Sequence, residues 1–249
     1  MQTVSINLNI RAASVLTFFT FGLATIGQTE ASQLPSSPRS DRVEANQRAH
    51  LENAFRQAGA ELGTPIYIRI FKETSELELW IAVDDKFELF KTYPICTFSG
   101  RLGPKLREGD RQSPEGFYYV TPARMNPWSR FHLSFNLGFP NAYDRHHGRT
   151  GSYLMVHGNC VSIGCYAMTN ARIEEIYSIA AAALRAGQPY FRVHVFPYRM
   201  TIDRTRQEQG SRWYGFWQNL KEGYDWFETH RTPPDTQVQN GRYVFRHSD

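Results

Sequence analysis

The sequence predicts a mixed α+β domain with a strand-rich core, a few helices and a helical C-terminal extension. Short runs of β-branched and aromatic residues recur between polar turns, as they do in strands. One well-capped amphipathic helix begins near Thr169, and aromatic residues recur at helical spacing in the tail. With 249 residues, the chain is long enough for one large domain and a small extension.

Composition and charge exclude several classes of protein. The chain is 41% hydrophobic and 14% aromatic, which is enough to fill a core and excludes disorder of the whole chain. The 28 Lys and Arg against 24 Asp and Glu give a net charge of only +4, without a basic block, so we expect no nucleic-acid partner. Three cysteines are too few for a disulfide scaffold and leave at least one thiol unpaired.

The N-terminus has the pattern of a secretory signal peptide over residues 1–31. Arg11 precedes an apolar run from Ala12 to Gly27, and small residues follow. This run is shorter than the roughly 20 residues of a membrane-spanning helix. We therefore expect an exported protein, with an uncleaved N-terminal membrane anchor as the alternative.

Residues 32–64 are predicted to hold a linker and a short helix. The linker is the Ser/Pro-rich segment 32–43. The helix that follows is amphipathic and should end near Gly59 or Gly63. Residues 65–199 then form the main domain. Its strands are predicted at 66–71, 77–83, 87–93, 117–121, 132–137, 153–157 and 190–196, with a long glycine-rich loop over 99–116.

One helix of the main domain and one of the extension stand out. The first has Thr169 or Asn170 as its N-cap, a buried stripe that includes Ile173 and Tyr177, and an end at Gly187. The second lies in residues 200–249, where Trp213, Phe216, Trp217, Leu220, Tyr224 and Phe227 recur at helical spacing. We expect this helix to dock on the main domain. A membrane-surface helix is the alternative, but its polar face is acidic.

The segment from Tyr153 to Met168 concentrates residues suited to catalysis. A predicted strand ends in His157-Gly158, a short loop carries Ser162 to Cys165, and a capped helix follows. Cys165 suits a nucleophile and His157 its base, and an imidazolium near the thiol would lower its pKa below the free value of ~8.5. Backbone N–H groups around Ile163 and Gly164 suit a developing oxyanion.

Other interpretations of these residues stay open at the level of sequence. Cys165 can be a buried structural thiol and His157 a core histidine. His157, Cys160 and Cys165 can also be metal ligands, with a fourth from His146-His147. Ser162 is a weak nucleophile candidate, because the first glycine of a serine elbow is missing.

The segment resembles the signature of the YkuD-type L,D-transpeptidase catalytic domain family. The resemblance rests on His157-Gly158 followed by Ser162-Ile-Gly-Cys165, and on Ser113-Pro-Glu-Gly-Phe-Tyr118 upstream. It covers roughly residues 65–197. The amino-acid sequences of the segments Gly148–Gly151 and Gly164–Thr169 are most similar to the YafK branch of this family.

This resemblance implies a cysteine acyltransferase that acts on peptidoglycan stem peptides in the periplasm. Cys165 would be the nucleophile and His157 the general base. Gly158, Ser162, Ile163 and Gly164 would be motif residues, with the oxyanion site around Gly164 and an orienting hydroxyl on Ser162. The family's reaction proceeds through a thioester and needs no cofactor or metal. A peptidoglycan-linked lipoprotein is a further candidate partner.

The chain departs from the family's usual motif at two positions. Ile163 replaces a histidine, and Ala167 replaces a common arginine two places after the cysteine. Arg149 and Arg124 are therefore the candidates to hold a substrate carboxylate. The departures leave two alternatives to transpeptidation, a hydrolase of the same family and a non-catalytic peptidoglycan-binding scaffold. Separately, the sequence leaves open whether Cys160 pairs with Cys96, which would leave Cys165 free, or with Cys165.

Overall fold

The computed structural model describes residues 1–3 and 34–247. All the helices and strands below belong to the unit Ser32–Asp249. The predicted signal peptide, apart from its first three residues, lies outside the described residues. No helix in the described ranges is long and apolar enough to cross a membrane.

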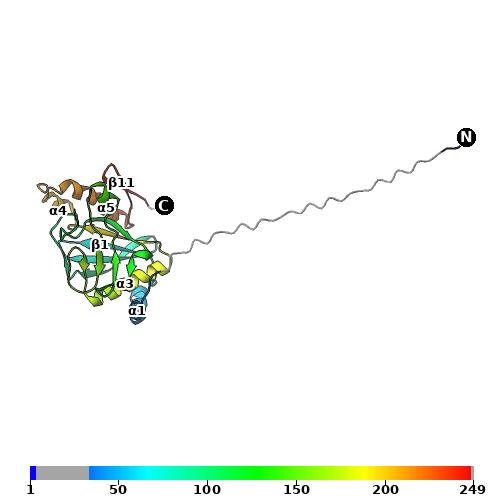
Figure 1. Ribbon diagram of the computed structural model, residues 1–249, viewed down its shortest axis with the longest axis horizontal. Coiled ribbons are helices and arrows are strands. Elements are labelled where there is room, and N and C mark those ends of the chain that lie inside the picture. The colour runs from blue at the N-terminus through cyan, green and yellow to red at the C-terminus, as the bar shows by residue number, and fades with distance from the viewer. Residues whose placement is uncertain (4–33, 248–249) are drawn as a thin grey trace. The chain divides into compact units, whose positions relative to one another are not determined.

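The larger sheet has five strands in the order β3, β2, β1, β10 and β5 (Figure 1). β1 and β10 are parallel, and the other neighbours are antiparallel. The mixed α+β class and these five predicted strands are confirmed. Their bounds are β1 (Ile66–Phe71), β2 (Glu76–Val83), β3 (Lys86–Pro94), β5 (Gly116–Val120) and β10 (Phe191–Phe196).

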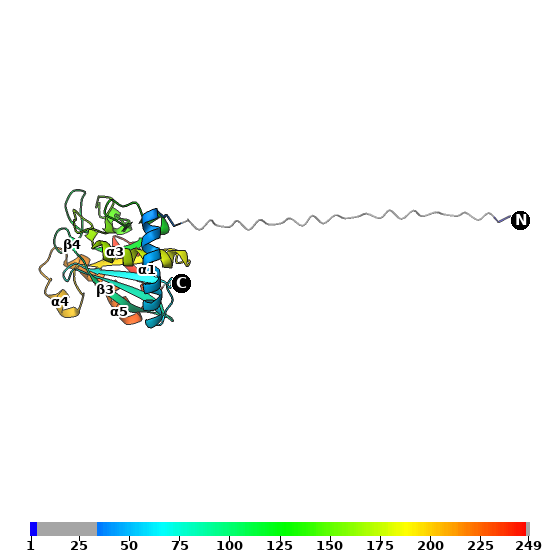
Figure 2. The same ribbon diagram turned by 90° about the horizontal axis from the view of Figure 1, so that it is seen from below.

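Both faces of this sheet are covered by helices, as two perpendicular views show (Figure 1 and Figure 2). Every residue of β1 is buried, because side chains alternate between the two covered faces. Ile66, Ile68 and Ile70 belong to the core beneath α1 (Pro38–Gln57) and α3 (Asn170–Arg185). Tyr67 and Phe71 belong to aromatic clusters that include residues of α5 (Tyr214–His230).

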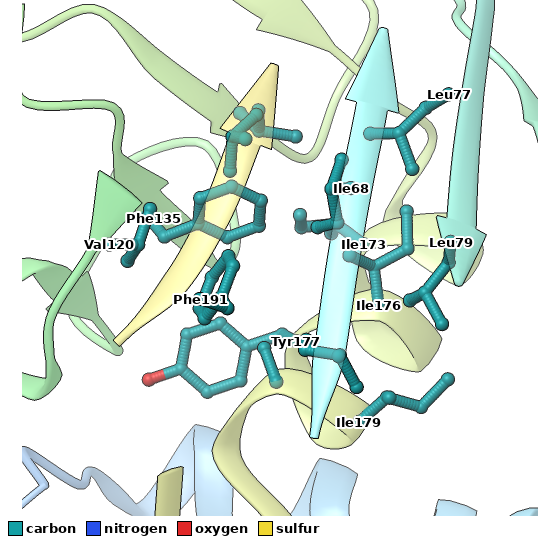
Figure 3. Packing of buried hydrophobic residues seen from close by; sticks show 14 of the residues in the cluster. Ile68, Leu77, Leu79, Val120, Phe135, Ile173, Ile176, Tyr177, Ile179 and Phe191 are labelled. Atoms are coloured by element: carbon teal, nitrogen blue, oxygen red, sulfur yellow. The ribbon is translucent and has the colours of Figure 1, made fainter. Parts of the chain in front are cut away.

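α3 has the capped, amphipathic form that the sequence predicts. The Thr169 side chain accepts a hydrogen bond from the Arg172 N–H at 3.4 Å, and the helix ends just before Gly187, whose φ is +107°. Figure 3 shows its apolar stripe against the sheet, with Ile173, Ile176 and Tyr177 packed near Ile68 of β1 and Phe191 of β10.

α1 begins at Pro38, inside the segment 32–43 that the sequence predicts as a linker. The Ser37 side chain accepts from the Ser40 N–H, and the Ser40 side chain accepts from the Ser37 N–H. This is a capping box, and Pro38 occupies the first helical position, where its missing N–H costs nothing. The serines and prolines that suggest a linker are therefore the start signal of the helix, and that part of the prediction is wrong.

The C-terminal extension contains the predicted aromatic helix and an unpredicted hairpin. α4 (Ile202–Arg206) precedes α5, whose Trp217 and Phe227 are buried against the main domain, so the docked helix is confirmed. β11 (Asp235–Gln239) and β12 (Arg242–Arg246) then form an antiparallel pair. Asn240 and Gly241 between them both have positive φ. The pair Asn-Gly is the usual sequence of a two-residue hairpin turn, because both of its central residues need positive φ.

The second five-stranded sheet, called the smaller sheet here because its strands are short, contains His157 and leads into Cys165. Its order is β4, β9, β8, β7 and β6, and only β8 and β9 are parallel. No helix or strand lies between β4 and β5, in agreement with the predicted long loop, and this stretch is fully described. The bounds are β4 (Thr97–Phe98), β6 (Met125–Asn126), β7 (Ser134–Asn136), β8 (Met155–His157) and β9 (Tyr166–Ala167), with a 3₁₀ turn at Pro122–Arg124 and α2 at Ala142–His146.

A buried ion pair joins the end of β1, the long loop and α5. The Glu115 carboxylate, with no exposed surface, accepts from Lys72 Nζ at 3.0 Å, from the Gly103 N–H at 2.6 Å and from Trp217 Nε1 at 2.8 Å. Lys72 Nζ also donates to the carbonyl oxygens of Gly103 and Ser113, at 2.9 and 3.1 Å. We name these five residues the Glu115 network.

Replacement of Lys72 by Met should strongly destabilise the protein. The change leaves the buried Glu115 charge without its cation, for which losses of about 3–5 kcal/mol are typical. Urea unfolding measures the free energy, with Lys91→Met as the control. Lys91 is 45% exposed in its pair with Glu175, so its loss should cost less than about 1 kcal/mol. Equal effects of the two substitutions would contradict the importance of the network.

Candidate active site

Cys165 and His157 are brought together by the parallel strands β8 and β9. His157 ends β8 and lies opposite Ala167, and Cys165 stands in a bend just before β9. Both residues line one cavity of about 560 Å³. The structure thus brings together the two residues that the sequence singles out.

The rim of this cavity is apolar and exposed. Tyr153 is 74% exposed, Val161 51% and Ile163 84%. Ile163 therefore points no polar group at the cavity from the position where the resemblance leads one to expect a histidine. The charged residues that line the cavity are Lys105, Glu108 and Arg130.

The imidazole of His157 is buried and held in one orientation. Only 2% of the residue is exposed, and Nδ1 lies 2.6 Å from the carbonyl oxygen of Gly158. Because a carbonyl can only accept, Nδ1 carries the hydrogen, and Nε2 of the neutral ring is left as a proton acceptor. The ring of Phe131 lies against the imidazole, with centroids 4.7 Å apart. Burial lowers the pKa of His157, so the ring is neutral at pH 7.

Only glycine fits at position 158, next to this histidine. A Cβ atom at this position would lie 2.8 Å from both the carbonyl oxygen of Phe131 and Oδ1 of Asn170. Its N–H donates to the carbonyl oxygen of Leu133. The backbone of the 129–133 segment can therefore approach His157 only because residue 158 lacks a side chain.

The thiol of Cys165 is free and partly buried. Its Sγ accepts from the Met155 N–H at 3.4 Å and donates to the carbonyl oxygen of Tyr153 at 3.6 Å. Burial raises the pKa of Cys165, although the Met155 N–H and the charge of Lys105 oppose this. The expectation of a thiol pKa lowered by an imidazolium is therefore wrong for this structure, because burial favours the neutral form of both groups.

Ser162 holds the loop that carries Cys165. Its Oγ donates to the carbonyl oxygen of Cys165 at 2.8 Å, accepts from the Gly164 N–H at 3.1 Å and lies 2.8 Å from Ser99 Oγ. Ser113 Oγ also donates to the Cys165 carbonyl, at 3.0 Å. Gly164 has a φ of +145°, which a residue with a side chain rarely adopts. Through these contacts Ser162 holds the backbone on both sides of Gly164 in place.

Cys160 forms a disulfide with Cys96, with Cα atoms 5.5 Å apart. This pairing settles which cysteines are bonded in the structure, and Cys160 is not available as a metal ligand. Within the described residues, no three His, Cys, Asp or Glu side chains are grouped so as to hold a metal ion. His147 instead contacts the carbonyl oxygen of Gly241 through Nε2 at 2.8 Å.

Neither arginine proposed for the substrate carboxylate lines the cavity. Arg149 is 7% exposed and pairs with the buried Asp144 at 2.8 Å. Arg124 lies over the ring of Tyr119 and donates to that residue's carbonyl oxygen. The guanidinium groups of Arg149 and Arg124 are thus both engaged in contacts within the protein. Arg130, which the sequence analysis did not single out, is the exposed arginine at the cavity.

Comparison with known proteins decides the family. The family model of the L,D-transpeptidase catalytic domain, YkuD, matches residues 65–195. The chain belongs to this family. The match covers the two five-stranded sheets except the last residue of β10, together with α3 and the residues that line the cavity with Cys165 and His157.

A curated relative of the chain carries the same family description, and some solved structures resemble it more distantly. It is 51% identical to the Escherichia coli K12 protein named "Putative L,D-transpeptidase YafK" over 183 residues, which cover 74% of each chain. Among solved structures, the helical cell shape determining protein Pgp2 of Campylobacter jejuni matches at 17% identity and a TM-score of 0.43, over 76% of this chain and 80% of Pgp2. Bd1075 of Bdellovibrio bacteriovorus matches at 20% identity and a TM-score of 0.39, over 65% of this chain and 60% of Bd1075.

Alkylation of Cys165 by iodoacetamide should accelerate with pH up to a midpoint above the ordinary thiol pKa of ~8.5. The reason is that burial raises the pKa of this thiol, so the reactive thiolate forms only at higher pH. Intact-mass measurement without reductant follows this thiol alone, because Cys96 and Cys160 are bonded.

His157→Ala serves as the comparison in this experiment. Loss of the neutral base should slow alkylation near pH 7 more than at high pH, where the thiol ionises unaided. A rate that is already constant below pH 7 in the unmodified protein would indicate a thiolate–imidazolium pair and contradict the neutral state.

Proposed function

We propose that the protein is an exported cell-wall enzyme that performs L,D-transpeptidase-type acyl transfer on peptidoglycan stem peptides through a thioester on Cys165. One observation carries the proposal: a free cysteine and a neutral, oriented histidine line one cavity. Family membership supplies the substrate class, since the matched domain is an L,D-transpeptidase catalytic domain.

The roles of the two residues follow from their protonation. His157 Nε2 takes the thiol proton of Cys165 as Sγ attacks the carbonyl carbon at the L-centre of diaminopimelate. The C–N bond then breaks, and the imidazolium returns the proton to the leaving amine. Transfer of the acyl group to a second amine gives a cross-link, and transfer to water gives a trimmed stem. The pair begins and ends each half-reaction neutral.

The backbone around Gly164 is the proposed oxyanion site. The Gly164 N–H is bonded to Ser162 Oγ, so we assign the N–H groups of Ile163 and Cys165 as the donors. Ser162 and Ser113 fix this loop by holding the Cys165 carbonyl. Donors held in place before reaction stabilise developing charge without reorganisation.

The periplasm is the proposed location. The signal pattern of residues 1–31 supports export. The Cys96–Cys160 disulfide supports an oxidising compartment, where such bonds persist. Stem peptides, and a lipoprotein attached to them, are substrates that this compartment offers.

The test uses purified protein with defined tetrapeptide muropeptides and whole sacculi. Mass spectrometry should show the acyl adduct on Cys165 and products that form at least about 1,000-fold more slowly in Cys165→Ala. Dimers linked between diaminopimelates would establish amine transfer, and shortened or lipoprotein-free stems without dimers would establish the hydrolase. Absence of adduct and product with both substrates would overturn the enzymatic proposal in favour of a peptidoglycan-binding scaffold.

A further inference from the structure

A second, smaller cavity adjoins the one that holds Cys165. It has a volume of about 290 Å³, and Arg130 and Phe131 line both cavities. Its other lining residues include Arg39, Asn159 and Asn170. We name it the arginine cleft.

The arginine cleft carries positive charge without a matching carboxylate in its lining. Two guanidinium groups, two side-chain amides, Ser129 and His132 line it, and among the described residues no Asp or Glu does. The carboxylate of Glu174, outside the lining, lies 2.6 Å from His132 Nε2. Arg39 is fixed, since its Nη1 donates to the carbonyl oxygens of Ser129 and His132, at 3.0 and 2.6 Å. Arg130 is exposed and has no ion-pair partner among the described residues. Such a site suits a small anion with planar acceptors, as a carboxylate is.

The position of the cleft relates it to the amine side of the reaction. Phe131 lies against the His157 imidazole, and Phe131 and Arg130 line both cavities. The leaving amine must approach His157 to receive its proton. The carboxylate of the amino acid that carries this amine is then within the part of the site that Arg130 lines, whereas the acyl part occupies the Cys165 cavity.

We infer that Arg130, in the arginine cleft, binds the free α-carboxylate of the amine component that leaves the scissile bond. This inference rests on the proposed function and identifies the specificity-determining residue of that reaction. It replaces Arg149 and Arg124, whose guanidinium groups have other partners. It also explains how the site operates with Ala167, buried in β9, where the family commonly has an arginine.

The experiment compares two tetrapeptide stems that differ only at the terminus, one ending in D-alanine and the other in D-alaninamide. Arg130→Gln should lower kcat/KM for the free acid about 10-fold or more, because a charge-assisted hydrogen bond is lost. It should change kcat/KM for the amide less than about twofold. Arg130→Lys should recover part of the loss, since it restores the charge but not the planar fork.

Two controls separate recognition from structure. Arg42→Gln removes an exposed arginine of α1 that lines neither cavity and should leave both substrates unchanged. Iodoacetamide labelling of Cys165 should be equally fast in Arg130→Gln and the unmodified protein. An equal loss on both stems, or slower labelling, would overturn the inference.

The failure of the proposed function has a different signature. In that case the unmodified protein acylates Cys165 with neither stem, and the inference falls with it. Acylation by both stems at equal rates, unaffected by Arg130→Gln, would leave the enzyme established and overturn only the role of Arg130.

Discussion

The buried carboxylate of Glu115 is the constraint on which the position of the nucleophile depends. Its three donors come from the end of β1, the long loop and α5. Ser113, two residues earlier, receives Lys72 on its carbonyl and gives its hydroxyl to the carbonyl of Cys165. The C-terminal helix is therefore joined to the catalytic loop through hydrogen bonds as well as apolar packing. A buried network of this kind favours one arrangement, because any lost partner leaves a charge unmatched.

Burial also decides the chemical state of the site. His157 is buried and Cys165 is partly buried. Among the described residues no carboxylate contacts the imidazole, whose partner is the neutral carbonyl of Gly158. Desolvation therefore favours the uncharged thiol and imidazole over an ion pair. A thiol that ionises only as it attacks is protected from unwanted alkylation and oxidation between turnovers, since the thiolate is the reactive form.

Local patterns in the sequence locate the chemistry, and long-range packing decides what surrounds it. His157 and Cys165 are predictable because a short loop and a strand pair connect them. The turn at Asn240-Gly241 could also be recognised from its sequence, although the hairpin was not predicted. The substrate arginine could not be recognised in this way. Arg149 forms a buried pair with Asp144, and Arg130 reaches the cavity on a segment that α1 holds from 90 residues away in the sequence. Such a contact leaves no periodic or spacing signal.

We propose that a neutral His157, protonated on Nδ1, serves as the base for a neutral Cys165. Nitrogen-15 NMR of the histidine side chains at pH 7, with His157→Ala to assign the resonance, measures this protonation state. We expect a neutral ring with its hydrogen on Nδ1, towards Gly158, and an unprotonated Nε2. A His157 ring protonated on both nitrogens at this pH would mean a resting thiolate–imidazolium pair and would rule out the neutral base.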